Sequence, residues 1–142
     1  MRKIAIFDIE ADGFLDKLTK IHCIAISYFK QEPILYTGDA ISEALKILME
    51  AEIIAGHNIL AYDIPAIRKI YPWFSPKGKV RDTLILSRLQ RVHQMQKHSL
   101  EAWGEYLKFP KGDFSGPWEE YTEEMGEYCL RDVKLNIQIW ND

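Results

Sequence analysis

The sequence predicts an α/β fold, with a mixed five-stranded sheet flanked by helices. Three strand-like segments come first, with short connections between them, and helical and extended segments alternate through the rest of the chain. The 142 residues are 47% apolar, which is enough for one substantial core. We therefore expect a single domain over residues 1–142.

The first three extended segments cover residues 3–9, 21–29 and 33–38. They are rich in β-branched and aromatic residues, as strands are, and the short links between them favour an antiparallel meander. The first segment is apolar on both faces, which is typical of a buried strand.

Helical and extended segments then alternate. Residues 52–56 and 79–82 are predicted to be short strands, Asp39 is placed to cap a helix, and Pro65 suits the first turn of another. The predicted helices cover residues 39–51, 63–70, 83–91, 100–107 and 118–140. This order of elements is typical of a ribonuclease-H-like fold.

One basic segment lies inside an otherwise acidic chain. The formal net charge of −3 taken alone argues weakly against a nucleic-acid ligand. Residues 77–98, however, carry six Lys and Arg side chains against Asp82 alone. This segment is either a solvated helix face or a surface that binds a phosphate backbone.

The cysteine content and the hydropathy pattern exclude several classes of protein. Cys23 and Cys129 lack the spacing of a zinc site or of a disulfide framework, so small buried hydrophobic residues are the simpler interpretation. No apolar run reaches the length of a membrane span, and no signal peptide is evident. We expect a cytoplasmic protein that makes no membrane contact.

Four acidic residues fall where the pattern predicts a core element or its end. Asp8 and Glu10 close the first strand at positions i and i+2, so their side chains share a face. Asp63 follows a buried strand, and Asp132 lies on an apolar face of the last helix. Because ligand sites in layered sheets collect at strand ends, the four acids are expected to converge.

Each acid also has a simpler interpretation. Asp63 could cap its helix, and Asp132 could pair with a neighbouring basic side chain. Glu10 and Asp12 could belong to a solvated turn. Asp82, in a buried setting of its own, is predicted to be an N-cap or a structural partner and not a fifth ligand.

Convergence of the four acids would demand a counter-charge. Two carboxylates about 5 Å apart repel by roughly 3 kcal/mol at an effective dielectric constant near 20. An all-oxygen ligand set suits Mg²⁺ or Mn²⁺, and two such ions form a known clamp for in-line displacement at a phosphodiester. The acids therefore indicate chemistry on a phosphate.

Three short motifs resemble those of the DEDD-type 3′→5′ exonucleases. They are "FDIEADG" near the N-terminus, "HNILAYD" at residues 57–63 and "YCLRD" at residues 128–132. Tyr128, preceded by Glu127 where another subtype has histidine, indicates the tyrosine subtype, DEDDy. The stretches "LTKIHCIAI", "RDTLILSRL" and "HSLEAWGEYL" extend the likeness over the whole chain. They resemble the proofreading exonuclease domain of family A DNA polymerases from small tailed bacteriophages.

The resemblance implies a two-metal phosphodiesterase that releases nucleoside 5′-monophosphates from a 3′ end. By motif match, Asp8, Glu10, Asp63 and Asp132 would hold two divalent cations, Mg²⁺ or Mn²⁺. Tyr128 would orient the attacking water, since a phenol is a poor base at neutral pH.

The resemblance also implies contacts to the substrate. Phe14 or Leu15 would stack against the terminal base. The backbone of Ala11 and the side chain of Asn58 would contact the terminal nucleotide. His57 would take part as well, unless it is only a satisfied loop histidine.

The chain ends soon after the third motif, so we expect a small stand-alone exonuclease with no polymerase domain. The alternative is an exonuclease domain separated from its polymerase. Single-stranded DNA is the expected partner, and RNA is the alternative substrate. A catalytically idle nuclease-fold module that binds 3′ ends is the alternative without enzymatic activity. If the chain is phage-encoded, its location would be the host cytoplasm.

Overall fold

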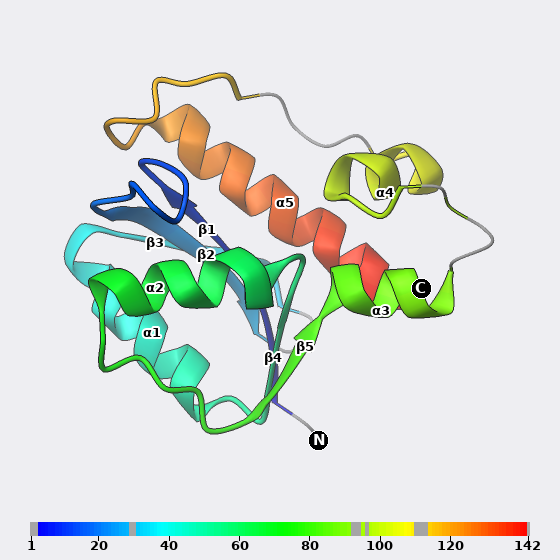
Figure 1. Ribbon diagram of the computed structural model, residues 1–142, viewed down its shortest axis with the longest axis horizontal. Helices are drawn as coiled ribbons and strands as arrows, with labels where there is room; N and C mark the ends of the chain where they lie inside the picture. Colours follow the sequence, from blue (N-terminus) through cyan, green and yellow to red (C-terminus); the bar gives the residue numbers. More distant parts are fainter. Residues whose placement is uncertain (1–2, 29–30, 92–94, 96, 110–113, 142) are drawn as a thin grey trace.

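The computed structural model describes residues 3–28, 31–91, 95, 97–109 and 114–141 (Figure 1). These residues form one five-stranded sheet with the order β3-β2-β1-β4-β5. The strands are β1 (Ile4–Ala11), β2 (Ile21–Tyr28), β3 (Ile34–Thr37), β4 (Ile53–Gly56) and β5 (Lys79–Asp82). Strands β1, β2 and β3 pair antiparallel, and β4 and β5 add parallel to β1. The predicted mixed sheet and meander are confirmed.

Helices cover both faces of this sheet. On one face lie α1 (Ile41–Glu50) and α2 (Ile64–Ile70), and the long α5 (Glu123–Asn141) crosses the other (Figure 1). Beside α5 pack α3 (Thr83–Gln90) and α4 (Leu100–Leu107). No helix in the described residues combines the length and the apolar character needed to span a membrane.

The alternation of side chains along β1 decides what faces α5. Phe7 and Ile9 are buried in the core beneath α1 and α2, whereas Ile6 packs in the cluster that contains Cys129 of α5. Because alternate residues of a strand share a face, Asp8 and its second neighbour Glu10 continue the face of Ile6. The two carboxylates therefore rise toward α5.

Two predicted boundaries near the N-terminus differ from the structure. Strand β1 continues to Ala11, two residues beyond the predicted end, and a bulge follows Glu10. Asp39 does not cap α1, because it lies in a 3₁₀ turn, Gly38–Ala40, that precedes the helix.

The last helix begins at Glu123, five residues later than predicted. The Thr122 hydroxyl accepts a hydrogen bond from the Met125 N–H at 3.2 Å and so caps the helix. Upstream, the Trp118 carbonyl accepts a 2.6 Å hydrogen bond from His22 Nε2 of β2. That tertiary contact holds the backbone outside the helix, which sequence periodicity alone cannot indicate.

Gly78 lies where the chain before β5 packs closely against the chain before β4, and this close packing can be tested. A Cβ at this position would collide with the backbone carbonyls of Ala51 and Glu52, which precede β4. Since backbone cannot move aside cheaply, we expect Gly78→Ala to lower the free energy of unfolding by about 2 kcal/mol or more in urea titrations. Gly13→Ala is the matched control, because its Cβ would meet its nearest atoms at 3.8 Å. Equal stability of the two variants would refute this account.

Candidate active site

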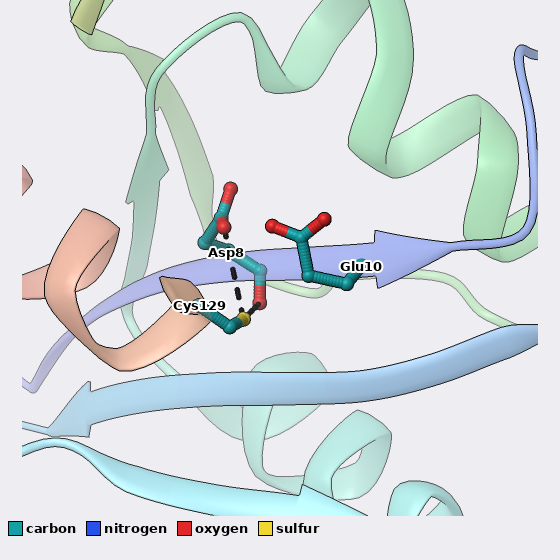
Figure 2. Close-up of side chains that lie close together, drawn as sticks. All are labelled: Asp8, Glu10 and Cys129. Atoms are coloured by element: carbon teal, nitrogen blue, oxygen red, sulfur yellow. Dashed lines mark hydrogen bonds between the residues drawn. The ribbon is translucent and has the colours of Figure 1, made fainter. Parts of the chain in front are cut away.

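The carboxylates of Asp8 and Glu10 lie on the same side of β1, as their spacing predicts (Figure 2). Glu10 is buried and Asp8 is half-buried. One oxygen from each and the Sγ atom of Cys129 lie within 4.8 Å of one another. This spacing allows the three side chains to share a cation.

Cys129 is a neighbour of the cluster that the sequence prediction missed. Its thiol donates toward the Asp8 carbonyl at 3.4 Å and lies 3.7 Å from Asp8 Oδ2 (Figure 2). Burial, followed by contact with Cys23 and the Asp8 charge, raises the pKa of the Cys129 thiol well above its ordinary value. The thiol therefore stays protonated and acts as a donor to Asp8. Burial of both free cysteines is confirmed.

Asp63 reaches the same end of β1 from the turn after β4. Its side chain is 4% exposed, and its Oδ2 atom accepts a 3.3 Å hydrogen bond from the N–H of Ile9, between Asp8 and Glu10. It makes no capping hydrogen bond to α2, so that alternative is wrong. Burial raises the pKa of Asp63 well above its ordinary range, and nearby acidic charges, including that of Asp132, add to the effect.

Asp132 approaches the cluster from α5. Its side chain is 3% exposed, and it follows Cys129 by three residues, so both lie on the helix face toward the sheet. Its Oδ1 atom is buried without a hydrogen-bond donor among the described residues, although the residue has other interactions. The adjacent Arg131 places its guanidinium 4.6 Å from the centre of the Phe109 ring.

The phenol of Tyr62 shows that the acids share one electrostatic environment. Burial is the main cause that raises the pKa of Tyr62 to about 12, and the charges of Asp63, Glu10 and Asp8 all contribute. These acids come from β1 and from the turn before α2. The structure thus places side chains from separate segments around one point at the carboxyl end of β1.

Tyr128 belongs to an aromatic cluster that the sequence prediction did not identify. Its ring centre lies 5.9 Å from that of Phe114, and Phe114 packs edge-on against Trp118 at 4.7 Å. Trp118 is fixed in turn through its carbonyl by His22. The segment before α5 therefore packs against the tyrosine of the third motif.

Phe14 stands at the tip of a rigid loop after β1 and is 84% exposed. Desolvation would raise the pKa of Asp12, but hydrogen bonds from Thr19 and Lys20 outweigh it and lower the pKa to about 2. Asp12 lies in the solvated turn after β1, as one alternative from the sequence had it, and these hydrogen bonds clamp the loop. Leu15 is half-buried against the core.

The loop that carries Phe14 is also tied to α2 and the turn before it. The Tyr62 hydroxyl donates to the Gly13 carbonyl at 2.7 Å, and Lys69 Nζ donates to the Leu15 carbonyl at 2.9 Å. These bonds hold the backbone on either side of Phe14 and leave its ring exposed.

His57 and Asn58 of the second motif differ in their surroundings. His57 is buried, with Nδ1 2.8 Å from the Thr83 hydroxyl and Nε2 2.5 Å from the His98 carbonyl. Both ring nitrogens therefore have partners inside the protein, which gives His57 a structural role in place of the predicted contact to a nucleotide. Asn58 is exposed in a left-handed conformation, and Ala11 is buried at the end of β1.

The basic side chains of residues 77–98 are spread over several elements, from the approach to β5 to the end of α3 and beyond. Lys77 precedes β5 and pairs with Glu50 of α1 at 2.7 Å. Because β5 runs parallel to β1, Lys77 lies near the end of the sheet opposite the carboxylates. Arg91, after α3, stacks over the Trp103 ring at 5.5 Å. Lys77 therefore lies away from the carboxylates, residues 92–94 and 96 lie outside the described part of the chain, and binding of a phosphate backbone by the segment stays a prediction.

The donor chemistry of the cluster fits a hard divalent cation. Asp8, Glu10, Asp63 and Asp132 offer carboxylate oxygens, which Mg²⁺ and Mn²⁺ prefer. Such an ion would also favour the ionised form of Asp63, whose pKa is raised by burial and, to a smaller extent, by nearby acidic charges. Cys129 is a protonated donor in this arrangement and is not required as a ligand.

No family model matches the sequence. The chain is 31% identical to the DNA-directed DNA polymerase of Escherichia phage T7 over 165 aligned positions, and 32% identical to that of Enterobacteria phage T3. Each alignment covers 94% of this chain but only 22% of the phage protein. The predicted similarity to phage DNA polymerases is confirmed, and the chain spans under a quarter of their length.

Solved structures share the fold. Brucella melitensis NrnC bound to pGG superposes with a TM-score of 0.74 at 18% identity, and NrnC with bound Mg²⁺ gives 0.71 at 18%. Both comparisons cover 97% of this chain and 72% of NrnC. The family B DNA polymerase of Pyrobaculum calidifontis gives 0.70 at 14% identity, over 99% of this chain and 24% of the polymerase. These matches confirm the fold class.

We expect divalent metal to raise the melting temperature of this protein, and the size of the rise to depend on Asp63. A folded-state pKa above the unfolded value means that, without metal, stability falls as pH rises through the folded pKa. Asp63→Asn removes this charge, so we expect a higher melting temperature in EDTA at neutral pH. We also expect the variant to lose most of the rise of several degrees that saturating Mn²⁺ gives the wild type.

Differential scanning calorimetry at fixed pH measures both effects. Asp39→Asn is the control, because Asp39 is an exposed acid in the turn before α1. An Asp63→Asn variant that is less stable in EDTA and keeps the full response to Mn²⁺ would contradict the placement of Asp63 in a cation site.

Proposed function

We propose that this chain is a metal-dependent 3′→5′ exonuclease that hydrolyses phosphodiester bonds at DNA 3′ ends and releases nucleoside 5′-monophosphates. The observation that carries the proposal is the position of Asp63, bonded to the N–H of Ile9 between the carboxylates of Asp8 and Glu10. Buried like charges brought together in this way suit a cation site for phosphoryl chemistry. The similarity to phage DNA polymerases supports a nucleic-acid substrate.

Asp8, Glu10, Asp63 and Asp132 would hold two divalent cations, Mg²⁺ or Mn²⁺. When bound, such ions stabilise charge on the phosphate and lower the pKa of a coordinated water. The carboxyl end of β1 and the middle of α5 would keep Asp8, Glu10 and Asp132 in register, since neither segment is a loop. The structure of NrnC with bound Mg²⁺ gives a precedent for this ion on the same fold.

Tyr128 would position the water that attacks the phosphate. Its ring is half-buried and packs against Phe114, which limits the directions its hydroxyl can take. A phenol with an ordinary pKa near 10 is a weak base at neutral pH, so hydrogen bonding to the water is the more effective role.

The Phe14 loop would bind the terminal nucleotide. An exposed ring on a rigid support can stack on a base with little entropic cost, and such stacking tolerates any base. Leu15, the Ala11 backbone and the Asn58 side chain would complete the contacts to the end of the strand. A single strand exposes its bases to such a platform, so single-stranded DNA is the preferred substrate. If the chain is phage-encoded, it would meet this DNA in the host cytoplasm.

A 3′→5′ exoribonuclease is the second candidate. NrnC was solved with pGG, so this fold accepts a short oligonucleotide. DNA and RNA differ by the 2′-hydroxyl, and side-by-side hydrolysis of matched oligomers distinguishes the two activities.

The experiment that tests the proposal follows 5′-labelled DNA and RNA oligomers, single- and double-stranded, with Mg²⁺ or Mn²⁺. We expect stepwise shortening from the 3′ end, with mononucleotides identified by mass. Because both residues would hold cations, Asp8→Asn and Asp132→Asn should each lower the rate by about 100-fold or more. Faster hydrolysis of RNA would favour the second candidate. Binding of 3′ ends with no turnover under Mn²⁺ would indicate an idle module and refute the enzyme.

Tyr128→Phe separates water positioning from metal binding. Loss of the hydroxyl should slow hydrolysis by about 10- to 100-fold. This loss is at or below the smallest one expected when a general base is removed. The affinity for Mn²⁺, measured by isothermal titration calorimetry, should stay at the wild-type value. Phe114→Leu is a useful companion, because it loosens the Tyr128 ring while keeping the hydroxyl. Abolished Mn²⁺ binding in Tyr128→Phe would show that this role for Tyr128 is wrong.

A further inference from the structure

The turn between β4 and α2 has an unusual backbone. Asn58 adopts a left-handed conformation with φ of 64°, and a single π-helical turn, Ile59–Asp63, follows it. A left-handed conformation is uncommon for a residue other than glycine, and π-helical turns are rare for any residue. Such backbone conformations persist where neighbouring groups hold them. Asp63 is the last residue of this turn, so its position depends on whatever holds the turn.

Asp82, at the end of β5, holds the start of the turn. Its Oδ1 atom accepts from the N–H groups of Asn58 at 2.8 Å and Leu84 at 2.9 Å, and its Oδ2 atom accepts from Leu60 at 3.0 Å. The carboxylate is 5% exposed and lies beside Gly56 in the parallel register of β4 and β5. One buried carboxylate thus satisfies three backbone donors.

A cap for α3 explains only one of these bonds. The bond to Leu84 is an ordinary N-cap interaction, which confirms the sequence prediction for Asp82. The other two bonds cross to the turn before α2, more than 20 residues earlier in the chain. They shape the segment that carries Asp63.

Thr83 connects the same turn to α5. A carbonyl can only accept, so His57 Nε2 donates to the His98 carbonyl, and His57 Nδ1 must then accept from the Thr83 hydroxyl in a neutral ring. The Thr83 oxygen also accepts from Asn136 Nδ2 at 3.1 Å. Asn136 lies one helical turn beyond Asp132, on the same face of α5.

We propose that Asp82 and Thr83 are positioning residues that fix Asp63 and Asp132 relative to each other, so that the two carboxylates can bind the same cations. This inference rests on the proposed function, because it takes both acids as cation ligands. Partners that orient metal ligands typically change metal affinity by 10- to 100-fold when they are removed. Asp82 and Thr83 contact the turn and α5 from one position at the start of α3.

Mn²⁺ binding without substrate, measured by isothermal titration calorimetry, tests the inference independently of catalysis. Asp82→Asn leaves an amide N–H₂ where a carboxylate oxygen accepted a backbone N–H, and Thr83→Val removes the hydroxyl. Each should weaken Mn²⁺ binding by about 10- to 100-fold. At Mn²⁺ concentrations below saturation, each variant should also have a lower kcat than the wild type, while KM for the oligonucleotide stays near the wild-type value. Higher Mn²⁺ should restore part of the lost rate.

Two control variants separate positioning from simple loss of stability. Thr83→Ser keeps the hydroxyl and should bind Mn²⁺ like the wild type. Ser99→Ala removes the N-cap bond of α4 to Ala102, a comparable local change outside the turn, and should lower stability without changing Mn²⁺ affinity. Wild-type affinity in folded Asp82→Asn and Thr83→Val would overturn the inference. If Asp82→Asn does not fold, the comparison of Thr83→Val with Thr83→Ser decides.

The same data separate this inference from the proposed function. If the wild type binds Mn²⁺ but hydrolyses no oligonucleotide, the exonuclease proposal is refuted. The Mn²⁺ affinities of the variants then still test the positioning role of Asp82 and Thr83. An active wild type with unaffected variants refutes only the positioning role. A wild type that binds no Mn²⁺ refutes both.

Discussion

The gathering of like-charged carboxylates at one end of β1 constrains the rest of the structure. Asp8 and Glu10 lie within a few ångströms of each other, and Asp63 bonds to the backbone between them. At about 5 Å, each ionised pair costs roughly 3 kcal/mol at an effective dielectric constant near 20, a large part of the stability of a small domain. The fold must therefore hold these groups rigidly and leave room for a counter-charge, and it does so by mounting them on a central strand under α5.

The neighbours of the cluster are consistent with an external counter-charge. Cys129 and Tyr62 both contact this region, and burial together with the acidic charges raises the pKa of each. Both groups therefore stay protonated at neutral pH. The Cys129 thiol donates toward Asp8 without neutralising its charge, and the Tyr62 hydroxyl donates to the Gly13 carbonyl. Neutral donors of this kind suit a cation site, because a permanent positive side chain in the same place would compete with the metal for the carboxylates.

The sequence predicted the sheet, the helices on both faces and the face shared by Asp8 and Glu10, because these follow from local periodicity. It did not predict the start of α5, which depends on the contact of His22 with the Trp118 carbonyl, or the π-helical turn before α2. Both depend on partners far away in the chain. The position of Lys77 depends on the fold in the same way: the basic segment begins at the end of the sheet opposite the carboxylates, which a run of positive charge in the sequence does not reveal.

Asp63 and Asp82 show how hydrogen bonding separates a structural carboxylate from a candidate ligand. Both are buried, and both border the turn after β4. Asp82 accepts three backbone N–H bonds of 2.8 to 3.0 Å, which replace the solvation of its charge. Asp63 accepts a longer bond of 3.3 Å from Ile9, and burial raises its pKa in spite of that bond. The charge of Asp82 is satisfied by the backbone it organises, whereas a bound cation would favour the charged form of Asp63. The sequence predicted Asp82 to be an N-cap or a structural partner, but it could not give the two bonds to the turn after β4, because their donors come from another part of the chain.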